Sequence, residues 1–384
     1  MARDKSINIW QTGIFIFIII FANKVLLLPS LLYRDANVEG IFCYLILFLL
    51  EIGLIFLFIV LKSKFPNVSF ASLVKEKFGI VTLKIIYFLL IIFFLCKLIL
   101  IYNVTYIFFK DLIYKENDTI IFLVCFLPII NYLAFVGLRV LGRTCQLFFP
   151  LILIIALFCV IISFIGISST PLFYQSNVSE VLISSLKHIS SFGDVIFLYL
   201  FMDKIDYKKG DGKKLVFFAL SAMILIILMA IAFYFSYTYT SFMHQYAIFE
   251  VMGNIKDYGG LGRIDVIAVI LIIFLTYFQM GIYLKCFTES FNVLLPKLHK
   301  QYALITFDIL FVIIVELIIR NLERTILYGE SILPYLSIIS FVIIPLCSII
   351  FLIIKRRGEK WKEWKLILNW FLKCQWLLCL FWFP

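Results

Sequence analysis

Charged residues are scarce in this sequence. Of its 384 residues, only 15% are Asp, Glu, Lys or Arg, whereas 64% are apolar. A soluble domain of this length needs far more polar surface to stay in water, so the composition excludes the soluble classes. The mean hydropathy of +1.09 points the same way. Because the apolar segments recur along the whole chain, we predict an all-α polytopic membrane protein.

The motifs of common enzymes and metal sites are also missing. The sequence contains no P-loop, no GxSxG and no HExxH. Its three histidines, His188, His244 and His299, lie far apart. The nine cysteines are scattered, mostly within apolar runs, and show no CxxC or Cys/His spacing, so we interpret them as small buried hydrophobic residues. We therefore expect no enzymatic activity, no cofactor and no bound metal.

About ten apolar segments approach the roughly 20 residues that a membrane-spanning helix requires. They lie near residues 7–33, 40–61, 81–109, 119–137, 147–168, 181–203, 215–237, 264–284, 302–320 and 332–354. If the N-terminus is cytoplasmic, Lys and Arg number 22 in the inner segments and 8 in the outer ones. Because these residues gather in cytoplasmic loops, we expect both termini in the cytoplasm.

The chain divides into one transmembrane domain and a tail. Residues 1–357 form a single permease-like domain in this interpretation, and residues 358–384 are basic and then apolar. Trp and Lys favour the membrane interface, so we expect the tail to lie there as an amphipathic helix. A short eleventh span is the alternative.

Polar residues interrupt the first apolar segment. Ala22, Asn23 and Lys24 stand inside it, and Pro29 follows five residues after Lys24. Charged residues at membrane depth cost roughly 2.5–3.5 kcal/mol on insertion scales, which makes them candidates for function. The pattern is typical of a discontinuous helix whose free backbone groups face a cavity. A kinked helix with a lysine that reaches to the interface is the simpler alternative.

The sixth segment carries a second interruption. Ser190, Ser191, Phe192, Gly193 and Asp194 precede the apolar run VIFLYLFM. A half-helix that begins here would direct its free N–H groups into the cavity, which suits a carboxylate ligand. Alternatively, residues 181–191 form an external loop, but the remaining span of about 12 residues would be too short to cross the membrane.

Further polar residues lie at membrane depth in other segments. Glu51 needs a cation or a neutral form there, and both Lys24 and Lys97 could be its partner. The remaining positions are Tyr277, Gln279, Asp308 and Glu316. We include Tyr277 among the candidate ligand-binding residues, whereas Asp308 and Glu316 could serve only helix packing.

Two interrupted helices, the first and the sixth, in a chain of ten resemble the amino acid–polyamine–organocation transporter architecture. Several local stretches narrow the resemblance to the spore germination permease family, the membrane B subunits of nutrient germinant receptors. They are SINIWQ at 6–11, LLLPSLL at 26–32, GLRVLGRTCQLFFPLI at 137–152, SSFGDVIFLYLF at 190–201 and GLGRIDVIAVILIIFLTYF at 260–278. The resemblance covers about residues 7–357 and rests on the order and spacing of these stretches.

The resemblance implies a fold and a function. The fold is a pair of inverted five-helix repeats, here about 7–168 and 181–354, with substrate bound at the unwound parts of helices 1 and 6. The function is a sensor of a small nutrient, typically an amino acid, that triggers germination. Its partners are an A subunit and a C-subunit lipoprotein, and its location is the spore inner membrane. An amino acid–cation symporter of the same fold is the alternative.

The sequence departs from the family pattern at three positions. Asp194 stands where members commonly have Glu, Gln146 where an acidic residue is common, and Lys24 where small residues are usual in the superfamily. The cation of Lys24 could replace a coupling ion or pair with a ligand carboxylate. Arg139 and Arg143, in the expected inner loop between helices four and five, are candidates for partner or gating contacts. The positive-inside rule alone would also explain them.

Overall fold

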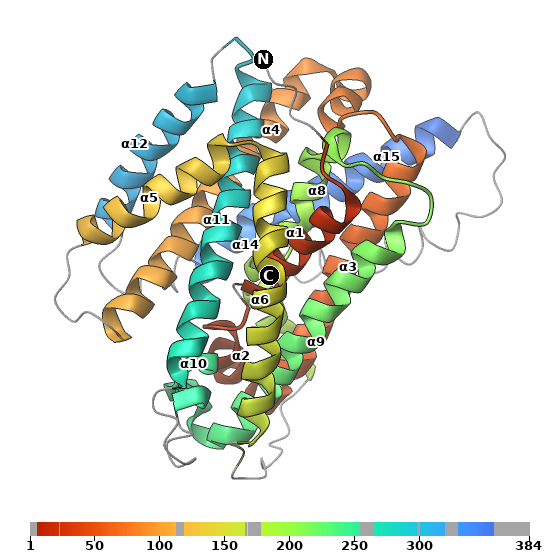
Figure 1. Ribbon diagram of the computed structural model, residues 1–384. Helices are drawn as coiled ribbons and strands as arrows, with labels where there is room; N and C mark the ends of the chain where they lie inside the picture. Colours follow the sequence, from red (N-terminus) through yellow and green to blue (C-terminus); the bar gives the residue numbers. More distant parts are fainter. Residues whose placement is uncertain are drawn as a thin grey trace.

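The computed structural model describes residues 6–356 except 23, 113–118, 166, 168–177, 254–263, 298–299 and 319–328. Its described residues form helices and connecting turns, and their one β pairing is an isolated bridge between Ile7 and Ile205. Figure 1 shows the helices gathered in one elongated bundle. The expected all-α class is therefore confirmed, and the predicted tail 358–384 lies outside the described residues.

The order of the helices follows the apolar segments of the sequence. The longer helices are α3 (Gly40–Lys64), α4 (Phe70–Leu112), α5 (Thr119–Phe135), α6 (Leu138–Ile165), α9 (Gly212–Tyr237), α11 (Asp265–Leu294) and α12 (Lys300–Ile318). The shorter ones are α1 (Ile9–Ala22), α2 (Leu28–Ala36), α7 (Val178–Lys187), α8 (Phe197–Leu200), α10 (Ala247–Gly253), α14 (Leu333–Leu336) and α15 (Ile344–Arg356).

Six helical segments are long and apolar enough to cross a membrane, judged by length and composition within the described residues. Three shorter apolar helices, at 9–22, 123–135 and 301–315, accompany them. Large apolar side chains point outward from the bundle, for example Leu147, which is 75% exposed, and Phe217. Such a surface is costly in water and favourable in lipid, so these helices support an integral membrane protein.

Two helices begin earlier than the sequence predicted. The third segment, expected at 81–109, belongs to α4, which starts at Phe70 and changes direction at Gly79, where φ is +87°. The fifth, expected at 147–168, belongs to α6, which starts at Leu138. Arg139 and Arg143 therefore lie on the first turns of a helix, and their placement in a loop was wrong. Helix continues through these polar residues because Arg is a good helix former.

Helix α1 lies at the centre of the bundle. It packs against α6, α9 and α11, and all residues from Phe15 to Phe21 are fully buried. A helix that is hydrophobic all round is buried all round, as the sequence of α1 indicates. Its end at Ala22 is partly buried and leads into the buried turn at residues 24–27.

The last helical segment contains an irregular turn. Between α14 and α15, residues Ile339–Ile343 form a π-helical turn, in which each hydrogen bond spans one residue more than in an α-helix. Such turns are rare and often mark functional sites. Ser340 and Phe341 of this turn lie against Gly193.

Candidate functional site

The structure interrupts both of the helices that the sequence predicted to be discontinuous. Turns at residues 24–27 separate α1 from α2. Two single turns of 3-10 helix, Ile189–Ser191 and Asp194–Ile196, separate α7 from α8, and between them Gly193 adopts the left-handed conformation with φ +82°. Glycine adopts this conformation without the steric cost that a Cβ atom imposes.

Protein donors satisfy two of the carbonyl groups at the first interruption. The hydroxyl of Tyr44 donates to the carbonyl oxygen of Lys24 at 3.0 Å, and the backbone N–H of Ala247 donates to that of Leu26 at 3.0 Å. Buried backbone groups need such partners because an unpaired polar group away from water costs free energy. The break is therefore a built feature, held by α3 and by the start of α10.

Lys24 and Glu51 form one fully buried ion pair at this break. The ammonium nitrogen of Lys24 lies 3.2 Å from Oε1 of Glu51, and both side chains have no exposed surface. The same oxygen accepts a hydrogen bond from the backbone N–H of Gly193 at 3.1 Å. The Lys24 nitrogen also lies 4.7 Å from the centre of the Phe192 ring, a cation–π contact. Glu51 therefore joins the two interruptions.

Lys97 and Asp194 form a second fully buried pair. Nζ of Lys97 lies 2.7 Å from Oδ1 of Asp194 and also donates to the carbonyl oxygen of Ser190. The hydroxyl of Tyr283, which accepts a hydrogen bond from Gln279, also interacts with Asp194. Sequence reasoning left open whether Glu51 pairs with Lys24 or Lys97, and the structure selects Lys24.

These four charges are balanced, two positive against two negative. Removing a charge from water costs several kcal/mol, and only close pairing with additional hydrogen bonds compensates for that cost. Acceptors stay unused in both pairs, because Oε2 of Glu51 and Oδ2 of Asp194 are buried and have no hydrogen-bond partner among the described residues. The site can therefore take further donor groups.

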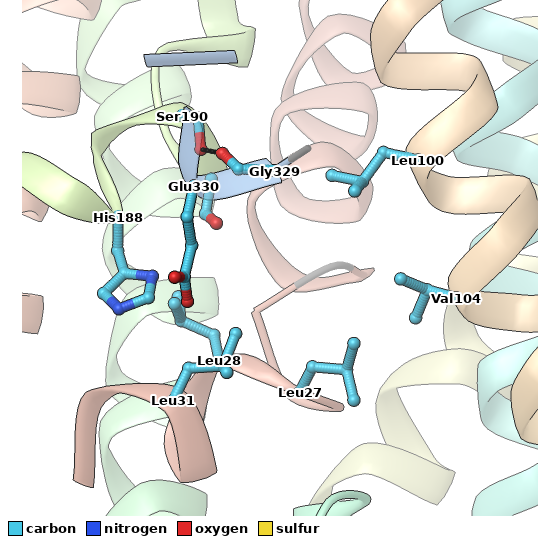
Figure 2. Close-up of a pocket in the computed structure, with 10 residues that line it drawn as sticks. Leu27, Leu28, Leu31, Leu100, Val104, His188, Ser190, Gly329 and Glu330 are labelled. Carbon is cyan, nitrogen blue, oxygen red and sulfur yellow. Dashed lines mark hydrogen bonds between the residues drawn. The ribbon is translucent and has the colours of Figure 1, made fainter. Parts of the chain in front are cut away.

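A small cavity of about 60 Å³ adjoins the second interruption. Its polar lining residues are His188, Ser190, Ser191 and Glu330. In Figure 2, His188, Ser190 and Glu330 lie on one side of the cavity, and Leu100 and Val104 lie on the opposite side. The apolar residues are Leu27, Leu28, Leu31, Leu100 and Val104. Ser190 connects the cavity to the Lys97–Asp194 pair, since its carbonyl oxygen accepts a hydrogen bond from Lys97. The cavity thus offers a small ligand one apolar and one polar side.

Not every candidate from the sequence lies at this site. Tyr277 stacks on Phe126 of α5, with ring centres 4.1 Å apart. Arg139 and Arg143 belong to α6, and Ala22 ends α1 beside the break. Asn23 lies outside the described residues.

Asp308 also lies elsewhere in the bundle. Its carboxylate accepts two hydrogen bonds from the side-chain amide of Asn131, at 2.9 and 3.0 Å. These bonds link α12 to α5, as expected for a residue that serves helix packing.

Three residues near the site, His188, Glu330 and Ser340, could not be recognised as site residues from the sequence. His188 lies within the expected sixth segment and Glu330 lies between the ninth and tenth segments, and nothing near either residue indicates a shared cavity. Ser340 stands in an apolar run, where a lone serine is common in membrane helices. Only the contact of the π-helical turn with Gly193 distinguishes it.

The sequence profile of spore germination proteins matches residues 6–322. This chain belongs to the spore germination protein family. A search of curated proteins finds no match to the chain. The matched region includes both interruptions and both buried ion pairs, whereas Glu330 and the π-helical turn lie beyond it. Its membership of this family, together with its apolar helices, identifies the protein as a germination-related integral membrane protein.

Proposed function

We propose that this spore germination protein is the membrane subunit of a nutrient germinant receptor and binds an amino acid in the cavity between its two interrupted helices. The observation that carries this proposal is the meeting of both interruptions at one buried charge network beside a cavity. A ligand there contacts both breaks at once. Ligand binding would therefore favour one arrangement of the interrupted helices over another.

The wider assembly belongs to the same proposal. The chain would act with an A subunit and a C-subunit lipoprotein in the spore inner membrane, with both termini in the cytoplasm. The two helical repeats, about 7–168 and 181–354, would move relative to each other on ligand binding. Such a shift at the centre of the bundle would reach partners bound at its surface.

A symporter of the same fold is the second candidate. In a cation-coupled transporter, buried carboxylates and free carbonyl groups bind the coupling ion. Here the ammonium groups of Lys24 and Lys97 already neutralise Glu51 and Asp194. The carbonyl of Lys24 is also occupied, by Tyr44. This pairing favours a receptor that needs no coupling cation over a symporter.

Deletion of the gene tests the receptor function. Spores without this chain should lose their response to one class of amino acid, and the wild-type gene should restore it. The double variant Lys24→Met/Glu51→Gln should express but fail to restore the response, because it removes both charges and leaves neither unpaired. Loss of refractility on addition of single amino acids is the measurement.

Two further measurements complete the test. Asp211→Asn is the matched control, because it removes a carboxylate that pairs with Lys214 at the start of α9 and contacts neither the cavity nor the buried pairs, and it should respond normally. Membrane vesicles with the wild-type chain should not accumulate labelled amino acid. An unchanged response of the deletion strain to every amino acid would contradict the receptor, and accumulation in vesicles would favour the symporter.

A further inference from the structure

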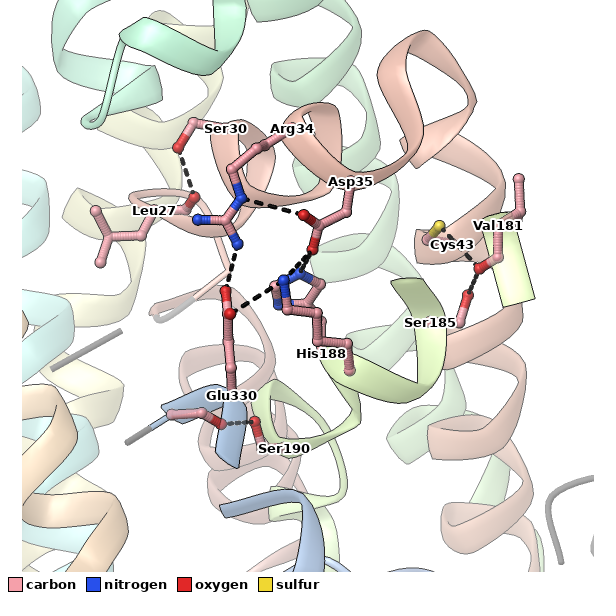
Figure 3. A network of polar contacts seen from close by, with 12 residues as sticks. Leu27, Ser30, Arg34, Asp35, Cys43, Val181, Ser185, His188, Ser190 and Glu330 are labelled. Carbon is pink, nitrogen blue, oxygen red and sulfur yellow. Dashed lines mark hydrogen bonds and ion pairs between the residues drawn. The ribbon is translucent and has the colours of Figure 1, made fainter. Parts of the chain in front are cut away.

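Five charged or titratable residues meet at one end of the cavity, and we call them the ionic cluster. They are Arg34 and Asp35 at the end of α2, Lys187 and His188 at the end of α7, and Glu330 just before α14. The members come from three segments that are far apart in the sequence. Figure 3 shows the side chains of Arg34, Asp35, His188 and Glu330 pointing toward one another.

Close contacts link all five members. Arg34 lies 3.1 Å from Asp35 and 2.5 Å from Glu330. Lys187 bridges the two carboxylates, at 2.9 Å from Asp35 and 3.0 Å from Glu330. His188 completes the cluster at 2.8 Å from Asp35. Each of the three segments is thus joined to the other two.

The ionic cluster lies between solvent and the cavity. His188 and Glu330 belong to both, since they also line the cavity. On α2, Leu31 is the last residue that lines the cavity. Arg34 and Asp35 follow three and four residues later on the same face of the helix, one turn or roughly 5.4 Å further along its axis. The exposed fraction of the side chains falls from the outer members of the cluster toward the cavity. It is 39% for Arg34 and 35% for Lys187 but 3% for His188.

The charges argue for a link between segments and against a metal site. The ligand atoms of Asp35, His188 and Glu330 lie within 4.8 Å of one another, which is close enough to suggest a cation. However, the ammonium group of Lys187 already occupies the position between the two carboxylates. With Arg34 present as well, two cations balance two carboxylates, and a divalent ion would have to displace them.

We propose that the ionic cluster is a latch that closes the mouth of the cavity, and that a ligand enters only when Glu330 separates from Arg34 and Lys187. The latch holds α2 and α7, the outer halves of the two interrupted helices, against the segment before α14. The identity of the ligand rests on the proposed function, whereas the closure of the cavity does not depend on it. Opening therefore exposes the cavity in the absence of any nutrient.

The rate at which a thiol in the cavity becomes accessible tests the latch. Val104→Cys places a reporter on the cavity wall, and a charged methanethiosulfonate reagent modifies it in protein purified in detergent. Mass spectrometry of the peptide separates this thiol from the native cysteines. Glu330→Gln should speed the modification about five- to tenfold, because it weakens two partly exposed ion pairs while keeping the side-chain shape. Lys187→Met is the second variant if Glu330→Gln does not fold.

Salt and a matched control complete the experiment. Raising ionic strength should speed modification of the chain with an intact latch and have little effect on Glu330→Gln, since salt screens exposed pairs. Glu289→Gln is the control, because Glu289 is as buried as Glu330 and also contacts two lysines, Lys204 and Lys285, but does not line the cavity. It should leave the rate unchanged. Equal rates in all variants, or equal acceleration by Glu289→Gln, would overturn the latch.

These results do not depend on the receptor. If spores that lack the chain respond normally while Glu330→Gln still opens the cavity, the proposed function fails and the latch stands. If the deletion abolishes the response but accessibility is insensitive to Glu330 and Lys187, the receptor stands and the latch fails.

Discussion

Gly193→Ala should abolish the germination response and reduce the yield of folded protein. The new Cβ atom would lie 2.6 Å from Oγ of Ser340 and 2.8 Å from the ring of Phe341, distances that force a neighbour to move. The residue would also keep a φ of +82°, which costs a non-glycine residue roughly 1–2 kcal/mol. Together with overpacking, we expect a loss of about 2–5 kcal/mol, measured by thermal unfolding in detergent.

Gly210→Ala separates the two contributions to this loss. Gly210 also has a positive φ, +100°, but a Cβ atom there would meet nothing within 4 Å. It should therefore show the backbone cost alone and keep the germination response. Adding Ser340→Ala to Gly193→Ala removes the closest contact and should recover part of the stability. Equal losses at Gly193 and Gly210 would show that the π-helical turn does not restrict the break.

Lys97→Met should destabilise the protein by about 3–5 kcal/mol, because it leaves the carboxylate of Asp194 buried without its cation. It also removes the hydrogen bond to the carbonyl oxygen of Ser190, at the second interruption. We expect a fall in melting temperature and in the amount of monodisperse protein after size-exclusion chromatography.

The double variant Lys97→Met/Asp194→Asn is the matched test of this explanation. It removes both charges, so the folded yield should return most of the way to that of the wild type. The germination response should stay absent, because the charges at the second break are gone. If the double variant is as unstable as Lys97→Met, packing around the long lysine side chain accounts for the loss and the ion pair does not.

The positions of both helix interruptions could be predicted from the sequence. Lys24 and the stretch around Gly193 are polar residues within apolar runs, and polarity at membrane depth is visible without a structure. The boundaries of helices were harder to predict. Arg139 was expected in a loop because it is basic, but its segment continues the helix that follows.

The partner of each buried charge could not be predicted. Glu51 is 27 residues from Lys24 and 46 from Lys97 along the chain, and separation along the sequence does not indicate which lysine its helix approaches. The same limit applies to the ionic cluster, whose members stand near helix ends and resemble loop charges. Their approach depends on how three separate segments pack together.

The sequence by itself determined that this protein is a bundle of membrane helices, and where two of them break. Both follow from the free energy of transferring each residue from water to lipid. This free energy depends mainly on the residue itself and its immediate neighbours. Only the tertiary structure decided that Lys24 pairs with Glu51, that Lys97 pairs with Asp194, and that Glu330 and His188 meet at the cavity. Pairing energies depend on distances between segments, and those distances exist only once the helices have packed.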